Sequence, residues 1–328
     1  MQNNTILNNI IEKIKTSTRS VVFSHQNPDG DTLGSMLALG ALLKKSGHSV
    51  DHIISDPVPE IYKFLPYTDL VCRPDDSNIQ KKHDLAFSLD CGSLKRLGKA
   101  KEIWLEAQTT INIDHHISNE NFGKINLIEA EAVSTGQVVY ELAKALNLKI
   151  TKEIATLLYT TLLTDTGCFS NSKTNASALV WGAELIKLGA EHENIYRKAF
   201  LEKPFKAIKL FGSALSDINS IEDGQILWTY IDKDMMKNLS ATGEDTEDIV
   251  DYMMRTKEVL VGVFFREDES EIKVSLRSNT DNVDVSKIAM SMGGGGHKKA
   301  AGINIKKSFS EVKDVILEKV IFELKNKS

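Results

Sequence analysis

The stretch Thr110-Ile111-Asn112-Ile113-Asp114-His115-His116 joins a short apolar run to three consecutive side chains that can bind metals. Residues 110–113 are rich in β-branched side chains, which favours a buried strand. The aspartate and the two histidines would then follow at the carboxyl end of that strand. Open α/β sheets place their binding sites at this end of their strands. The stretch therefore predicts a metal site at the edge of a parallel sheet.

A turn of similar chemistry lies upstream, in His25-Gln26-Asn27-Pro28-Asp29-Gly30-Asp31. It follows the β-rich run 21–23 and precedes a helix-like stretch. A proline and a glycine supply the turn geometry. The spacing of Asp29 and Asp31 lets both carboxylates point to neighbouring positions, whereas an ordinary surface turn would need only one. We expect this turn to contribute to the same metal site.

Two further aspartates complete the set. Asp90 closes the strand-like run 84–89, and Asp165 lies in the tetrapeptide Thr164-Asp165-Thr166-Gly167. Either residue alone could be structural, since Asp-containing turns and helix caps are common. The candidate metal-binding residues are His25, Asp29, Asp31, Asp90, Asp114, His115, His116 and Asp165. Because four segments supply them, we expect a pair of divalent ions, with Mn²⁺ preferred and Mg²⁺ or Co²⁺ as alternatives. We assign no chemistry to His48, His52, His83 and His192.

The 328 residues are enough for two domains. Strand-like and helix-like runs alternate as far as about residue 190, as a parallel α/β sheet requires. We therefore expect an α/β domain over residues 1–190, a charged helical connector over 191–217 that could act as a hinge, and a smaller α+β domain over 218–328. In the first domain we expect helices at 32–45, 134–146 and 151–163. In the second we expect strands at 225–231, 259–265 and 271–277, helices near 245–254 and 286–290, and a final strand and helix.

The run Gly293-Gly294-Gly295-Gly296-His297 is the most specific feature of the second domain. Consecutive glycines let backbone N–H groups approach an anion closely, so we interpret Gly294, Gly295 and Gly296 as a phosphate cradle with His297 beside it. A flexible glycine hinge is the alternative. Arg277 ends a predicted strand, where it could bind a phosphate or carboxylate through two hydrogen bonds or simply be an exposed charge. Arg255 is a weaker candidate for the same role.

Composition limits the classes of partner. The net charge of −5 lacks the basic excess that long nucleic acids require, so a short or mononucleotide substrate fits better. Three cysteines without CxxC spacing fit a reducing cytoplasm. The N-terminal residues show no secretion signal, and no apolar run reaches membrane-spanning length. We expect a cytoplasmic protein with no membrane partner, in which an exposed apolar helix face could support a homodimer.

Together these motifs resemble those of the DHH phosphoesterase superfamily, in its subfamily with a C-terminal DHHA1 domain. The resemblance covers almost the whole chain. It rests on the motifs described above together with Gly34-Ser35, Leu89-Asp90-Cys91-Gly92 and Ala300-Ala301-Gly302. Thr32 stands where the family commonly has Ala, a small change. The resemblance implies a parallel-sheet DHH domain, a smaller DHHA1 domain and an active site in the cleft between them.

The resemblance also implies roles for single residues. One metal ion would be bound by His25, Asp29 and Asp90, and the other by Asp31, Asp90, His115 and Asp165. Asp90 would then bridge both ions. Asp114 would orient a neighbouring histidine, and His116 would face the substrate phosphate and donate a proton or hydrogen bond to the leaving oxygen. The candidate substrate-binding residues are Arg277, Gly294, Gly295, Gly296, His297 and Arg255.

The compact length resembles the nanoRNase/pAp phosphatases, which degrade very short RNA and remove the 3′-phosphate of 3′-phosphoadenosine 5′-phosphate (pAp). Water would attack phosphorus directly in a two-metal mechanism. One alternative is hydrolysis of the linear or cyclic diadenylate (pApA or c-di-AMP). A manganese inorganic pyrophosphatase would share the first-domain motifs but resembles a different C-terminal type. A non-catalytic nucleotide sensor should have lost a metal ligand, and every expected ligand is present.

Overall fold

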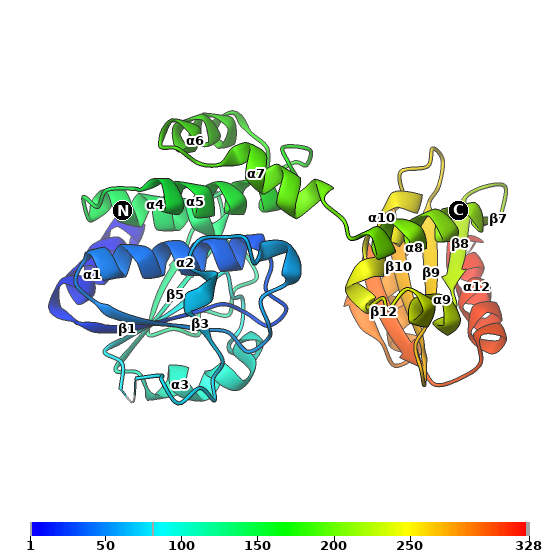
Figure 1. Cartoon of the computed structure of the whole chain (residues 1–328), viewed down its shortest axis with the longest axis horizontal. Coiled ribbons are helices and arrows are strands. Elements are labelled where there is room, and N and C mark those ends of the chain that lie inside the picture. Colours follow the sequence, from blue (N-terminus) through cyan, green and yellow to red (C-terminus); the bar gives the residue numbers. More distant parts are fainter. Residues whose placement is uncertain (1, 81, 326–328) are drawn as a thin grey trace. The chain divides into compact units, whose positions relative to one another are not determined.

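The chain divides into two compact units, Met1–Glu202 and Lys203–Ser328, each with its own six-stranded sheet (Figure 1). The computed structural model describes residues 2–80 and 82–325. Both units have hydrophobic cores of their own. The predicted fold class, a parallel α/β domain followed by a smaller α+β domain, is confirmed.

The first sheet is wholly parallel, with the strand order β3-β2-β1-β4-β5-β6. Its strands are β1 (Arg19–Phe23), β2 (Ser49–Ile53), β3 (Val71–Cys72), β4 (Leu85–Leu89), β5 (Thr109–Asp114) and β6 (Ile125–Ile128). From β1 the chain runs outward through β2 and β3, then returns to place β4 on the other side of β1. Such a reversal leaves a crevice at the carboxyl ends of the two central strands, where ligands bind in open α/β sheets.

Helices cover both faces of this sheet. The larger are α1 (Gln2–Thr16), α2 (Gly30–Lys45), α4 (Thr135–Ala145), α5 (Lys152–Asp165) and α6 (Ala176–Lys187), and the shorter are α3 (Lys101–Glu106) and α7 (His192–Tyr196). Short 3-10 turns at Glu60–Tyr62, Thr68–Leu70 and Leu94–Ala100 and a π-helical turn at Arg197–Leu201 complete the unit. Figure 1 shows α2, α4 and α5 on one face and α3 on the other. Strand β4 is accordingly buried at every residue, as expected for a parallel strand covered on both sides.

The layer of α2 and α5 depends on close helix approach. Gly34 of α2 faces α5, and a Cβ atom added there would lie 2.7 Å from the Leu157 carbonyl oxygen and 2.6 Å from the Thr161 methyl group. Only glycine allows the two backbones to come this near without displacing one helix. This contact holds the first turn of α2, which carries Asp31, against the helix that ends at Asp165.

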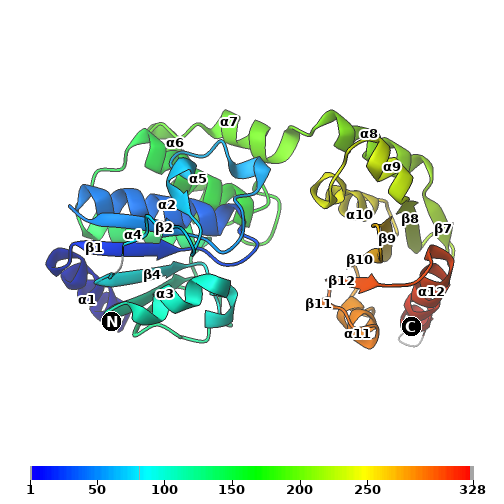
Figure 2. The same ribbon diagram turned by 60° about the horizontal axis from the view of Figure 1, so that its bottom comes forward.

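The second sheet is mixed, with the order β11-β12-β10-β9-β8-β7. Its strands are β7 (Asn219–Ile221), β8 (Ile226–Ile231), β9 (Val261–Glu267), β10 (Ile272–Ser278), β11 (Gly295–His297) and β12 (Ala300–Ile305). Only β8 and β9 pair in parallel. Its helices are α8 (Phe205–Ser216), α9 (Lys233–Asn238), α10 (Asp248–Met253), α11 (Val285–Ser291) and α12 (Phe309–Lys325), with a 3-10 turn at Gly243–Thr246. Figure 2 shows α8, α9 and α10 on one side of the sheet and α12 on the other.

The predicted connector, residues 191–217, divides between the units. Helix α7 and the π-helical turn belong to the first unit. Helix α8 buries Leu210 and Ala214 in a hydrophobic cluster of the second unit. The function of this segment as a hinge stays a prediction.

Sequence analysis did not anticipate α1, whereas the predicted helices and strands of both units are present. None of the described helices is long and apolar enough to cross a membrane.

Candidate metal centre

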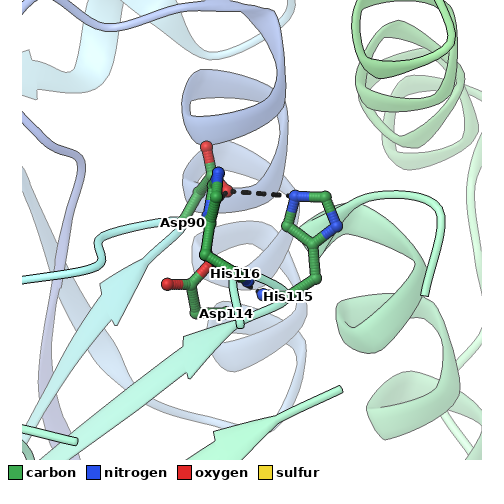
Figure 3. A group of neighbouring side chains, drawn as sticks. All are labelled: Asp90, Asp114, His115 and His116. Atoms are coloured by element: carbon green, nitrogen blue, oxygen red, sulfur yellow. Dashed lines mark hydrogen bonds and ion pairs between the residues drawn. The ribbon is translucent and has the colours of Figure 1, made fainter. Parts of the chain in front are cut away.

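The predicted metal-binding residues meet at the carboxyl edge of the first sheet. His25 lies two residues after β1, Asp90 follows β4 directly, and β5 ends at Asp114 with His115 next in the chain. Because β1, β4 and β5 are consecutive neighbours, their ends bring these side chains together. Figure 3 shows Asp90, Asp114, His115 and His116 around one point.

Helix termini bring the remaining carboxylates to the same place. Asp29 caps α2, its Oδ1 accepting hydrogen bonds from the backbone N–H groups of Asp31 (3.1 Å) and Thr32 (3.0 Å). Asp31 lies in the first turn of that helix, and Asp165 is the last residue of α5. The irregular turn before α2 and the end of α5 thus complete a set drawn from four separate segments.

The ligand atoms form three overlapping groups, within each of which all atoms lie within 4.8 Å of one another. The groups are His25 with Asp29 and Asp90; Asp31 with His115 and Asp165; and Asp90 with Asp114, His115 and His116. Asp90 links the histidines of two strands: its Oδ2 is 3.7 Å from His25 Nε2, and its Oδ1 is 3.7 Å from His115 Nε2. This central position fits a carboxylate that is shared by two ions.

Backbone carbonyl groups fix the orientation of both buried histidines. His25 Nδ1 lies 2.7 Å from the Gln26 carbonyl oxygen, and His115 Nδ1 lies 3.0 Å from that of Ala132. Since a carbonyl oxygen only accepts, each Nδ1 carries the proton and each Nε2 presents its lone pair. Both Nε2 atoms face carboxylates of the cluster. A metal-binding histidine has this arrangement, in which one ring nitrogen donates to a carbonyl group and the other is free to bind the ion.

Asp31 is the most enclosed carboxylate of the cluster. It is fully buried, and it accepts hydrogen bonds from Ser35 Oγ (3.1 Å) and from the backbone N–H groups of Thr135 (2.8 Å) and Gly136 (3.2 Å). The latter two begin α4, whose positive dipole end favours an anion. Thr135 also donates its hydroxyl hydrogen to Asp90 Oδ1 at 2.9 Å. The N-terminus of α4 therefore holds both central carboxylates in place.

The electrostatics of the cluster fit divalent cations. Burial, followed by repulsion from Asp90, Asp165 and Asp29, raises the pKa of Asp31 well above its ordinary value. Within the described part of the chain, His115 Nε2 is buried without a hydrogen-bond partner of suitable geometry, although Asp165 Oδ2 lies 3.1 Å away. A buried lone pair that points at several carboxylates needs a positive charge between them. The donor set of imidazole nitrogens and carboxylate oxygens matches such an ion.

Asp114 accepts hydrogen bonds from residues that follow it closely in the chain. It is fully buried and accepts hydrogen bonds from His116 Nδ1 (2.7 Å) and Asn119 Nδ2 (2.5 Å), and from the backbone N–H groups of His115 and His116. Burial raises the pKa of Asp114, but these hydrogen bonds outweigh it and the pKa lies below its ordinary value. The hydrogen bond that His116 donates to Asp114 in turn raises the pKa of His116. Asp114 thus orients His116 and favours its protonated form.

Sequence analysis missed Lys173, whose ammonium group lies 2.7 Å from Asp165 Oδ2. Burial raises the pKa of Asp165, but the nearby His115 ring and the hydrogen bond from Lys173 outweigh it, so the pKa lies below its ordinary value. Lys173 belongs to an irregular segment between α5 and α6, where no periodic pattern marks it. It lines a cavity of about 570 Å³ together with His115 and His116.

The predicted substrate-binding arginines lie in the second unit. Arg277, on β10, donates two hydrogen bonds to Asp251, with Nε–Oδ1 at 2.7 Å and Nη2–Oδ2 at 3.3 Å. The partner in this two-point contact is a carboxylate of the same unit. Arg277 and Asp251 line a cavity of about 770 Å³. Arg255 follows α10 and lies over the Tyr252 ring at 5.4 Å. Their contact with substrate stays a prediction.

The glycine run forms an edge strand. Residues 295–297 make up β11, which pairs with β12 so that His297 faces Ala300. Gly293 has a φ angle of +82°, and Gly296 one of +143°, both of which favour glycine. Gly294 also packs too closely against Gly302 for a side chain to fit. Residues 295–297 are exposed, and β11 is the last strand at one edge of the sheet. A phosphate cradle at Gly294, Gly295 and Gly296 stays a prediction.

Comparison with known proteins matches both units. Residues 19–162 fit the model of the DHH family, N-terminal domain, and residues 223–326 fit that of the DHHA1 domain. The bifunctional oligoribonuclease and PAP phosphatase NrnA of Thermus thermophilus is 32% identical over 291 residues, which are 87% of this chain and 83% of that protein.

Two solved structures extend the comparison. An exopolyphosphatase-related protein from Bacteroides fragilis has a TM-score of 0.88 and 27% identity, with 96% of each chain covered. RecJ from Thermus thermophilus, in complex with Mn²⁺, has a TM-score of 0.53 and 13% identity, covering 97% of this chain and 54% of RecJ. At that identity the second likeness concerns the fold alone.

Proposed function

This chain belongs to the DHH family of phosphoesterases and carries a DHHA1 domain, and from that membership we propose that it acts on short nucleotides. In this proposal it degrades short oligoribonucleotides to mononucleotides and dephosphorylates pAp to AMP. The observation that carries the proposal is the complete set of metal-binding side chains around Asp90. The name of the Thermus thermophilus relative supports the substrate class.

Both proposed reactions break the same bond. In pAp and in a dinucleotide, water forms a new bond to phosphorus while the bond between phosphorus and the ribose O3′ breaks. The O3′ oxygen takes up a proton and leaves as the 3′-hydroxyl group of a 5′-nucleotide. The products are phosphate and AMP from pAp, and two mononucleotides from a 5′-phosphorylated dinucleotide. One catalytic centre with one proton donor can therefore serve both substrates.

We assign the proton donor as His116. Its Nδ1 is bound to Asp114, so the opposite ring nitrogen, Nε2, is the one that can meet a leaving oxygen. The side chain is 42% exposed and lines the cavity beside the cluster. Its raised pKa favours the protonated ring that a general acid needs near neutral pH.

The metal site takes two divalent ions in this proposal, with Mn²⁺ preferred over Mg²⁺ or Co²⁺ for the mixed ligand set. His25, Asp29 and Asp90 would hold one ion, and Asp31, Asp90, His115 and Asp165 the other. When bound, the ions supply positive charge that activates a water molecule and neutralises the phosphoryl oxygens. The burial of Asp31 and Asp90 keeps bulk water from screening that charge.

The second unit would bind the part of the substrate that is remote from the broken bond. Arg277 could exchange Asp251 for a phosphate, because a guanidinium binds both anions through the same pair of N–H groups. Gly294, Gly295 and Gly296 would offer backbone N–H groups, with His297 and Arg255 as further donors. The three cysteines Cys72, Cys91 and Cys168 are free thiols, which fits a reducing cytoplasm, and we place the activity there.

A turnover assay with Mn²⁺ tests the proposal. It compares pAp, pApA, a single-stranded RNA of about 20 nucleotides and inorganic pyrophosphate at equal concentrations. We expect AMP from pAp and pApA at rates well above those for the long RNA. Hydrolysis of pApA alone would instead favour the diadenylate phosphodiesterase, and cleavage of pyrophosphate alone would refute the proposal. Absence of any turnover would favour the nucleotide sensor.

A further inference from the structure

The ammonium group of Lys173 forms an ion pair with Asp165, which is a candidate metal ligand. Their Nζ and Oδ2 atoms are 2.7 Å apart. The Lys173 side chain is 44% exposed, whereas that of Asp165 is 17% exposed. Lys173 therefore reaches the cluster from the solvent side on a flexible four-carbon chain. Such a chain can turn to a second anion without any change in the backbone.

The same carboxylate oxygen is needed by a metal ion. Asp165 Oδ2 is also 3.1 Å from His115 Nε2, and both residues belong to the group that includes Asp31. A divalent ion within that group would stand close to the ammonium group, and like charges at such distances repel strongly. Metal binding should therefore weaken the pair of Lys173 with Asp165.

The cavity next to the cluster gives the displaced ammonium group an alternative partner. Its volume of about 570 Å³ lies in the range of small-molecule sites. Lys173 and His116 line it together with the acidic Glu131, the polar Asn175 and apolar residues that include Ile117. Ile117 is 89% exposed, so an apolar surface borders the two basic groups. Basic and apolar surface side by side suits a phosphate that is attached to a sugar or base.

We propose that Lys173 is a substrate-binding residue that exchanges Asp165 for the phosphate of the substrate when the metal site is filled. Without metal or substrate, the ammonium group neutralises the Asp165 carboxylate. With both bound, it donates hydrogen bonds to the phosphate in the cavity beside His116. The substrate named here rests on the proposed function, whereas the competition with metal does not.

The proposal predicts two effects of opposite direction in Lys173→Met. Mn²⁺ titrated into the metal-free protein by calorimetry, without substrate, should bind roughly two- to fivefold more tightly, since a competing cation of modest strength is removed. The KM for pAp should rise roughly tenfold or more, because a charge-assisted hydrogen bond to the phosphate is lost. Lys173→Arg keeps the charge and should recover most of the wild-type KM.

Lys152→Met is the matched control, because Lys152 forms a comparable ion pair in the same unit, with Glu191 at 2.6 Å. It should change neither Mn²⁺ affinity nor KM. An unchanged KM in Lys173→Met would overturn the proposal, and so would weaker Mn²⁺ binding, which would mean that Lys173 merely positions Asp165. If the wild-type protein cleaves no nucleotide, the proposed function fails, while the metal titration still decides whether Lys173 competes for Asp165.

Discussion

Three buried histidines of the first unit differ in what their ring nitrogens meet. His25 and His115 each turn Nδ1 to a carbonyl oxygen and Nε2 to carboxylates. His52, on β2, has no hydrogen-bond partner at either nitrogen among the described residues. Burial, with a further contribution from the charge of Lys44, lowers the pKa of His52 to about 4, and the negative charges of Asp51 and Asp69 offset only part of this. His52 therefore stays neutral in the fold.

His52 should make the protein less stable in acid. Its pKa is about 4 in the folded state, against the ordinary histidine value of 6.5 in the unfolded chain, so the unfolded chain binds the extra proton as the pH falls below about 6.5. Between pH 7 and pH 5 this difference lowers the free energy of unfolding by about 2 kcal/mol.

Urea unfolding of the wild type and of His52→Leu at both pH values measures this effect. The change with pH should be about 2 kcal/mol larger in the wild type, because leucine does not titrate. The two proteins share all other ionisable groups, so the comparison isolates His52. If the free energy of unfolding changed equally with pH in both proteins, His52 would take up its proton in the folded protein as readily as in the unfolded chain.

Most residues of the metal centre could be predicted from the sequence, because each one lies in a short motif at the end of an element. Lys173 could not, since its contact with Asp165 depends on an irregular turn. The pair of Arg277 with Asp251 was equally out of reach, because 26 residues separate the two in sequence and only the packing of α10 on β10 joins them.

At the scale of elements, the packing of α2 against α5 sets the distance between two sides of the metal centre. Gly34 is the contact point of the helices. Displacement of α2 would move Asp31 in its first turn, whereas Asp165 at the end of α5 would stay. A tightly packed interior cannot absorb such a shift without cost.

Gly34→Ala should lower the free energy of unfolding by roughly 1–3 kcal/mol, the usual cost of overpacking. The control is Gly212→Ala in α8, where an added Cβ would have no described atom within 4 Å apart from the nearby backbone of its own helix. There the better helix propensity of alanine should raise stability by up to about 1 kcal/mol. Thermal unfolding of both variants tests the prediction, and a neutral Gly34→Ala would show that the helices separate easily.

The elements differ in how far the sequence predicts them. Helices α4 and α5 and strands β4 and β5 follow from apolar patterns and flanking turns. The glycine run has no side chains and hence no pattern, so its pairing as β11 depends on the neighbouring strand β12. Helix α1 carries its apolar residues in a polar N-terminal segment, and its place is fixed by burial of Ile10 and Ile14 in the core.

At the scale of the whole molecule, the candidate residues for metal binding and those for substrate binding outside the metal centre belong to different units. The candidate metal-binding side chains among the described residues lie in the first unit, and the glycine run, His297 and the two candidate arginines lie in the second. Metal affinity and substrate affinity should therefore respond to different substitutions.

His297→Ala tests this division. We expect the KM for a dinucleotide to rise roughly tenfold, the effect of one lost hydrogen bond to a charged group, with Mn²⁺ content unchanged. His297 is exposed, so the substitution should leave stability nearly unaltered. Steady-state kinetics and elemental analysis of the same preparation measure both quantities. Loss of Mn²⁺ in this variant would refute the separation of the two functions.

The central claim is that one cluster binds two ions and that Asp90 is shared between them. Asp90→Asn tests it best, because asparagine keeps the shape of the side chain and tolerates the left-handed φ of +54° at this position. The measurement is Mn²⁺ bound per chain, by calorimetry and elemental analysis, with turnover of pAp on the same samples. We predict two ions per wild-type chain, and loss of both ions and of turnover in Asp90→Asn. A single ion in the wild type, or two ions and full turnover in the variant, would contradict the account.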